Sequence, residues 1–180
     1  MRQPTIRAFA RFAAFALLAT PLLACVTGRA SAATASASRT HSSARAARPT
    51  DPEVASFVKL VNAHRIARGL PALIWDSRVA AVAKSHSQQM VDEDFFSHTT
   101  PDGVTTWGRL AARGISYSHA GENIAWGQKT GKAVFRGWLD SPGHRANIEQ
   151  DSYTHHGVGK VGTRWTHVFI RPRSGARASR

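Results

Sequence analysis

Three polar side chains occupy positions where the neighbouring residues are apolar or turn-forming. His98 follows two phenylalanines and a serine, Glu122 precedes Ile124-Ala125-Trp126, and His144 follows a Ser-Pro-Gly sequence. A carboxylate among apolar residues needs a partner, and a histidine imidazole is a suitable one. We therefore hypothesise that His98, Glu122 and His144 converge on one polar cleft.

These residue types allow two kinds of site. Two neutral imidazoles and a carboxylate are a plausible set of zinc ligands, with water completing the coordination. The same groups could instead form a hydrogen-bonded cleft without a metal. The intervals between the three residues are far too long for a local metal motif such as His-Glu-x-x-His, so the spacing does not choose between the two.

Helical spacing of apolar residues predicts the elements that carry these groups. An aspartate or a threonine stands before each of four predicted helices, where its side chain can cap the first free amides. The second of these helices places His86 on its apolar side, and we interpret this histidine as a core residue rather than a ligand. The four helices begin after Asp51, Asp76, Thr105 or Thr106, and Thr130, and a short fifth helix is expected over residues 145–148.

Near the C-terminus the apolar period changes from 3.6 to about two residues. Residues 157–161 and 165–170 are predicted to pair as a hairpin across a turn at 162–164, and residues 115–118 could add a strand. Helices followed by a hairpin predict an α+β domain in layers, with an antiparallel sheet. The neighbouring His155 and His156 are interpreted as a solvated turn before the hairpin.

The N-terminal 25 residues have the character of an export signal. Three arginines precede an uncharged apolar run from Phe12 to Ala24, which is short for a permanent membrane span. Leu22-Leu23-Ala24-Cys25 resembles a bacterial lipobox, which predicts lipidation and membrane anchoring at Cys25; the alternative is ordinary cleavage after Ala30-Ser31-Ala32. Cys25 is the single cysteine of the chain, so no disulfide and no disulfide-linked partner is expected.

Composition divides the remaining chain into three parts. Residues 26–50 form an Ala-, Ser- and Arg-rich linker, residues 51–172 the folded domain, and residues 173–180 a basic tail. Residues 53–172 hold 14 basic and 10 acidic side chains, so most of the net charge of +13 lies outside the domain. Basic and aromatic residues do not alternate in the way that nucleic-acid surfaces require, and no nucleic-acid partner is expected.

Five sequence segments, taken in order, resemble the CAP superfamily of cysteine-rich secretory, antigen 5 and pathogenesis-related proteins. The similarity covers residues 53–172 and is to the bacterial, disulfide-free SCP-like branch of that superfamily. The segments that carry it are Val61 to Arg65 with Gly69 to Leu73; Phe96-Ser97-His98; Gly121 to Ala125; Trp138 with Ser141 to Ile148; and Gly157-Val158-Gly159.

The resemblance implies a three-layer α-β-α sandwich with a central antiparallel β-sheet and a large cleft. The family's cleft holds two histidines and two glutamates, and three of the four match His98, Glu122 and His144. The second glutamate would stand three residues after Trp138, where this chain has Ser141. In the family the paired histidines, here His98 and His144, can hold Zn²⁺ or Mg²⁺, and several members bind sterols or other lipids.

The presence of only one of the family's two cleft glutamates bears on the expected function. We expect an exported bacterial envelope protein, lipid-anchored, periplasmic or secreted, whose cleft binds a lipid or another small molecule. The alternative is a metal-dependent hydrolase with Glu122 as the general base. A third reading gives the polar cluster a structural role alone. The loss of the second acid and the absence of a Gly-x-Ser-x-Gly motif favour a binding module over an enzyme.

Overall fold

The computed structural model describes residues 48–173 of the chain. The predicted signal segment with its lipidation site at Cys25, nearly all of the linker, and the tail beyond residue 173 lie outside the described residues. The helices are α1 (Pro52–Ala67), α2 (Ser77–Asp92), α3 (Thr106–Ala112), α4 (Gly131–Asp140) and α5 (Pro142–Glu149). The strands are β1 (Ile74–Trp75), β2 (Tyr117–Trp126), β3 (His155–Val161) and β4 (Arg164–Pro172).

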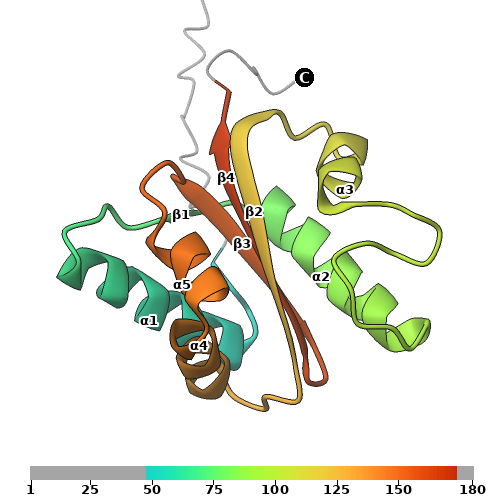
Figure 1. Cartoon of the computed structure of the whole chain (residues 1–180), viewed down its shortest axis with the longest axis horizontal. Helices are drawn as coiled ribbons and strands as arrows, with labels where there is room; N and C mark the ends of the chain where they lie inside the picture. Colours follow the sequence, from blue (N-terminus) through green and yellow to red (C-terminus); the bar gives the residue numbers. More distant parts are fainter. Residues whose placement is uncertain (1–47, 174–180) are drawn as a thin grey trace, which may run out of the picture. The chain divides into compact units, whose positions relative to one another are not determined.

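These elements form three layers around one sheet (Figure 1). Helices α2 and α3 cover one face, and α1, α4 and α5 cover the other. The core is correspondingly divided: Val82 and Val168 belong to the cluster under α2, whereas Phe57 and Trp165 belong to the cluster under α1 and α4. The predicted α+β fold with an α-β-α sandwich is therefore confirmed.

The four strands lie in the order β1-β3-β4-β2. The hairpin of β3 and β4 and the pairing of β2 with β4 are antiparallel, whereas the two-residue β1 runs parallel to β3. Strand β2 is longer than the predicted segment 115–118 and continues to Trp126, so Glu122 stands within a strand. Gly-Glu-Asn has low strand propensity, and pairing along β4 overrides it.

The predicted capping residues begin their helices as expected. The Asp51 carboxylate accepts from the amides of Glu53 and Val54 at 2.8 and 3.1 Å. Asp76, Thr105 and Thr130 cap α2, α3 and α4 in the same way. Helix α5 begins at Pro142 rather than near residue 145, because proline suits the first helical turn.

The interpretation of His155 and His156 as a solvated turn is wrong. Both residues belong to β3, and His156 is fully buried against the equally buried His167 of β4. The Nδ1 atom of His156 and the Nε2 atom of His167 are 2.9 Å apart, in hydrogen-bonding contact. Two adjacent histidines give no apolar signal in the sequence, so only the pairing of β3 with β4 reveals the burial of His156.

Helix α2 lies directly on strand β3 because two glycines allow it. A Cβ atom added at Gly157 would collide with the backbone of Val79 and Ala80, and one added at Gly159 with the backbone of Ala83 and Lys84. Among the helices of residues 48–173, none combines the length and the apolar character that a membrane-spanning segment requires.

Candidate functional site

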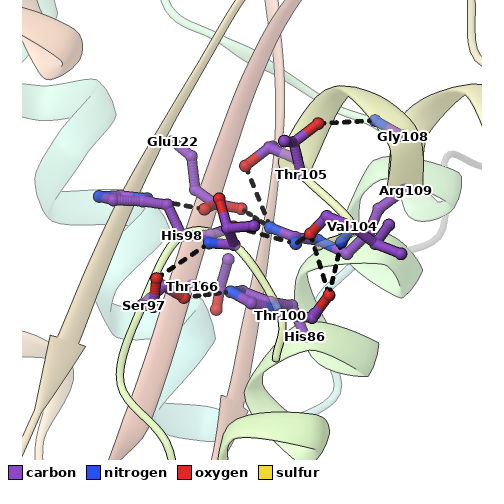
Figure 2. Close-up of polar contacts among 12 residues, drawn as sticks. His86, Ser97, His98, Thr100, Val104, Thr105, Gly108, Arg109, Glu122 and Thr166 are labelled. Atoms are coloured by element: carbon purple, nitrogen blue, oxygen red, sulfur yellow. Dashed lines mark hydrogen bonds and ion pairs between the residues drawn. The ribbon is translucent and has the colours of Figure 1, made fainter. Parts of the chain in front are cut away.

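Glu122 lies in β2 on the face of the sheet covered by α2 and α3. Its partner in β4 is Val168, which belongs to the core under α2. Only 3% of the Glu122 side chain is exposed, and both of its carboxylate oxygens have partners. Oε1 lies 2.8 Å from Nδ1 of His98, and Oε2 accepts from Nη2 of Arg109 at 2.8 Å (Figure 2).

His98 reaches Glu122 from the loop between α2 and α3. Its side chain is 53% exposed, so one edge of the ring faces solvent while the other contacts the buried acid. An ionised carboxylate can only accept a hydrogen bond, which makes Nδ1 the protonated nitrogen in the neutral ring. Nε2 is therefore left as the acceptor or metal-binding atom of His98.

Arg109 is the member of this site that the sequence did not single out. Its side chain is 9% exposed and extends from α3 to Glu122. Nη1 also donates to the backbone oxygens of His98 and Val104 at 3.0 and 3.1 Å, and Nη2 donates to the Thr106 hydroxyl at 3.0 Å. One guanidinium thus holds both the buried acid and the loop that presents His98.

These contacts determine the charge of Glu122. Burial alone would raise the pKa of its carboxyl group, but the hydrogen bond from His98 and the positive charge of Arg109 outweigh burial and lower that pKa below its usual value. Glu122 is consequently ionised at neutral pH. It serves as an acceptor that fixes His98 and Arg109.

His86 of α2 contacts the loop between α2 and α3 that carries His98. This residue of α2 is fully buried, its Nε2 lies 2.9 Å from the backbone oxygen of Ser97, and its ring packs 5.8 Å from that of Phe95. Burial lowers the pKa of His86, so the ring is neutral. The interpretation of His86 as a core residue is confirmed, and it also positions the residue before His98.

His144 does not join the hydrogen-bonded cluster of His98, Glu122 and Arg109. It lies in the first turn of α5, where its Nδ1 contacts the Ser141 hydroxyl at 2.9 Å. Burial and the nearby charge of His98 lower the pKa of His144, so it is neutral at pH 7. Ser141, where the resemblance leads us to expect a second acid, is therefore a hydrogen-bond partner of His144.

A chain of amides joins α5 to β2. Asn123 donates from Nδ2 to the His144 backbone oxygen at 3.0 Å, and its Oδ1 accepts from Asn147 at 2.8 Å. The Tyr153 hydroxyl donates to the Ala120 backbone oxygen at 3.1 Å. A Cβ atom at Gly121 would collide with the side chains of Tyr153 and Asn147, which explains the glycine before Glu122.

A pocket of about 400 Å³ opens beside His98 and Glu122. It crosses the outer edge of β2, the strand at one end of the sheet, and has walls from α3 and from the residues around α5. His144 is not part of its wall. The wall combines hydroxyl, amide and aromatic groups, contributed chiefly by Thr105, Thr106, Trp107, Asn147 and Tyr153.

The histidines fit a metal ion only in part. Within residues 48–173, no group of three or more His, Cys, Asp or Glu side chains is arranged to hold one. Both oxygens of Glu122 are already used, so it would act behind His98, as carboxylates commonly do behind metal-binding histidines. His98 and His144 each have one ring nitrogen outside their Nδ1 hydrogen bonds, and these are the residues that could hold a metal ion.

Comparisons with known proteins agree on the family. A model described as CAP, the cysteine-rich secretory protein family, matches residues 58–169. The Bacillus subtilis (strain 168) protein YkwD is 40% identical over 143 residues, which are 78% of this chain and 56% of YkwD. The chain therefore spans little more than half the length of this relative.

Solved structures agree on the fold. An extracellular protein containing an SCP domain from Bacillus anthracis str. Ames is similar with a TM-score of 0.64 and 36% identity, covering 69% of this chain and 45% of that one. An outer surface protein from Borrelia burgdorferi has a TM-score of 0.65 at 20% identity, covering 69% and 96% of the two chains. At that identity the second similarity concerns the fold alone.

Proposed function

The chain belongs to the cysteine-rich secretory protein (CAP) family, and from this membership we propose an exported, non-catalytic module that binds a lipid or another small molecule. The ligand occupies the pocket beside His98 and Glu122. Export is supported by the related Bacillus anthracis protein, which is extracellular. The charged N-terminal segment with its apolar run supports the same location.

The observation that carries this proposal is the double pairing of Glu122. A general base at neutral pH works best with a pKa near 7 and a free oxygen directed at its substrate. Glu122 has a lowered pKa and gives one oxygen to His98 and the other to Arg109. These contacts favour a rigid acceptor in a binding site over the base of a hydrolase.

The pocket wall indicates the chemistry of the ligand. Trp107 is 46% exposed and provides an apolar surface, while Thr105, Thr106 and the His98 ring provide hydrogen-bonding groups. Ligand pockets commonly combine an apolar wall with a few polar groups that fix orientation. An uncharged lipid with one hydroxyl group, such as a sterol, satisfies both requirements.

A divalent metal would bind through His98 and His144. Neutral imidazole nitrogens suit Zn²⁺, whereas Mg²⁺ prefers oxygen ligands, so zinc is the better match for these two residues. A bound zinc ion would add a positive charge and a Lewis-acid position next to the pocket. Residues of this chain would orient the two metal-binding rings: Glu122 contacts Nδ1 of His98, and Ser141 contacts Nδ1 of His144.

Binding of a fluorescent sterol tests the proposal, with the protein titrated in the presence and absence of Zn²⁺. We expect Trp107→Ala to weaken sterol binding by about tenfold, since an aromatic contact of this kind contributes about 1.5 kcal/mol. His98→Ala/His144→Ala should abolish any response to Zn²⁺. His119→Ala, at an exposed position of β2, is the matched control. Equal sterol affinity and equal zinc response in all four proteins would refute the site.

The hydrolase alternative predicts a different result. Turnover of an ester or peptide substrate that disappears in Glu122→Gln, while the melting temperature stays within a few degrees of wild type, would establish catalysis. A purely structural role predicts a lower melting temperature in Glu122→Gln and unchanged sterol binding.

Lipid anchoring at Cys25 forms part of the proposal for location. In bacterial cells fed an alkyne-tagged palmitate, the wild-type chain should become labelled and Cys25→Ala should not. Unlabelled wild-type protein would leave ordinary signal cleavage as the explanation.

A further inference from the structure

A second pocket lies at the opposite edge of the sheet from the His98–Glu122 pocket. Strand β1 pairs with only the first two residues of β3, so among residues 48–173 no strand pairs with the remaining edge of β3 on that side. The pocket there has a volume of about 230 Å³ and is lined by residues 48–51, the start of α1, α2 and β3. It shares no residue with the pocket beside His98.

Three positively charged side chains from separate segments line this pocket. They are Arg48 before α1, Lys84 of α2 and Lys160 of β3. Within residues 48–173, Arg48 and Lys84 make no ion pair, and Lys160 makes one loose contact, 3.7 Å from the Asp51 carboxylate. Three cations against one carboxylate leave an excess of two positive charges.

Asp51 is committed to the start of α1. Its Oδ1 accepts from the amides of Glu53 and Val54, so the helix start fixes the carboxylate, and only Oδ2 faces the pocket cation Lys160, at 3.7 Å. Lys160 is held in place as well: its side chain is 18% exposed, and its Nζ lies 5.7 Å from the centre of the Trp165 ring. The fold therefore fixes the position of Lys160, while the exposed Arg48 and Lys84 add their charges at the pocket mouth.

Apart from Thr50 and Ser77, the rest of the wall is apolar. Val54, Trp75 and Val158 face the pocket from three elements, and Ala80 and Ala81 of α2 complete it. Small side chains on α2 leave room for a ligand beside the half-buried Trp75 ring. A molecule that fills this space must carry a negative charge to pair with the cations and an apolar part to pack against the wall.

We propose that this pocket binds a phosphate monoester that carries a short apolar group. A phosphate monoester has a charge of about −1.5 to −2 at pH 7, which matches the excess of two positive charges. Arginine and lysine bind phosphate oxygens through charge-assisted hydrogen bonds. The apolar part of the ligand packs against Trp75 and Val158. The phosphate monoester group can belong to a lipid headgroup or to a free phosphorylated metabolite.

Calorimetric titration with hexyl phosphate tests this site. We expect saturable binding to the wild-type protein and at least about tenfold weaker binding to Lys84→Gln/Lys160→Gln, because the variant lacks two cationic groups that donate to the phosphate oxygens. Lys132→Gln, at an exposed position of α4, should bind like wild type. Inorganic phosphate and hexanol, which each lack half of the ligand, should both bind at least about tenfold more weakly than hexyl phosphate.

Several outcomes would overturn the proposal. These are absence of saturable binding by hexyl phosphate, equal affinity in the double lysine variant, or equal affinity for inorganic phosphate. Loss of hexyl phosphate binding in His98→Ala/His144→Ala would place the ligand in the other pocket. Thermal unfolding of each variant separates loss of binding from loss of fold. Vesicles of phosphatidylcholine with phosphatidic acid, a lipid whose headgroup is a phosphate monoester, then distinguish a headgroup from a free phosphate: a headgroup ligand makes the wild-type protein sediment with them more than Lys84→Gln/Lys160→Gln does.

Discussion

At the scale of single residues, Arg109 connects the buried acid to the loop that presents His98. Its guanidinium donates to Glu122, to the backbone of that loop and to Thr106 of its own helix. Planar, multidentate donation of this kind is specific to arginine. The orientation of His98 therefore depends on a residue outside the predicted set of His98, Glu122 and His144.

Removing Arg109 should destabilise the domain strongly. Arg109→Met leaves the Glu122 carboxylate buried without its cationic partner, and breaking a buried ion pair in this way costs about 3 kcal/mol or more. Chemical denaturation at pH 7 measures the loss. Arg113→Met, at the exposed end of α3, serves as the control and should change stability by less than about 0.5 kcal/mol.

A second substitution identifies the cause of that loss. If the unpaired charge is responsible, Arg109→Met/Glu122→Gln should recover part of the stability, because the neutral amide is cheaper to bury. A double variant less stable than Arg109→Met would show that the arginine acts through the loop backbone instead.

Sequence reasoning found two of the residues in this cluster and missed the third for a physical reason. His98 and Glu122 contrast with their apolar neighbours, so their burial or pairing could be predicted. Arg109 lies on a short helix, where an arginine is ordinarily solvated, and only the approach of α3 to β2 directs it inward. His156 was misread for the same reason, since strand pairing rather than local sequence buries it.

At the scale of elements, the helices were more predictable than the sheet. Helix starts depend on local capping, and Asp51, Asp76 and Thr130 carry that signal in the sequence. Strand β2 depends on a distant partner, so its extension through Gly121 and Glu122 could not be predicted from propensity. The two edges of the sheet, where both pockets lie, are likewise products of pairing.

The contact of α2 with β3 gives a prediction at this scale. Gly159→Ala would place a Cβ atom against the backbone of Ala83 and Lys84, and neither helix nor strand can move without disturbing the core. We expect a loss of about 1–3 kcal/mol in the free energy of unfolding. The change should appear as a lower melting temperature.

Gly137 provides the matched control. It lies in α4 at an exposed position, and an added Cβ atom there meets nothing within 4 Å. Gly137→Ala should therefore raise stability by about 0.5–1 kcal/mol through helix propensity. Destabilisation of similar size at both glycines would argue against close packing of α2 on β3.

At the scale of the whole molecule, buried histidines make the domain less stable as the pH falls. Burial, with a smaller effect from Arg65, lowers the pKa of His156 to about 3. The pKa of His167 is lowered well below its usual value, again chiefly by burial. Because an unfolded histidine titrates near pH 6.5, the unfolded chain takes up protons at a pH where the folded one does not.

Acidification should therefore lower the free energy of unfolding, because the pKa values of His156 and His167 are lower in the folded chain than in the unfolded one. The stabilisation is complete above pH 6.5 and is lost as the pH falls toward 3, with each of the two histidines contributing up to about 1.4 kcal/mol per pH unit. Chemical denaturation at half-unit steps from pH 7.5 to 5 measures the slope. His156→Gln/His167→Gln should reduce the slope, since glutamine keeps hydrogen-bonding groups without titrating, and the lowered pKa values of His86 and His144 account for the slope that remains. Exposed His119→Gln should leave the slope unchanged. Stability that stays constant between pH 7 and 5 in the wild-type protein would show that the pair is not held neutral by burial.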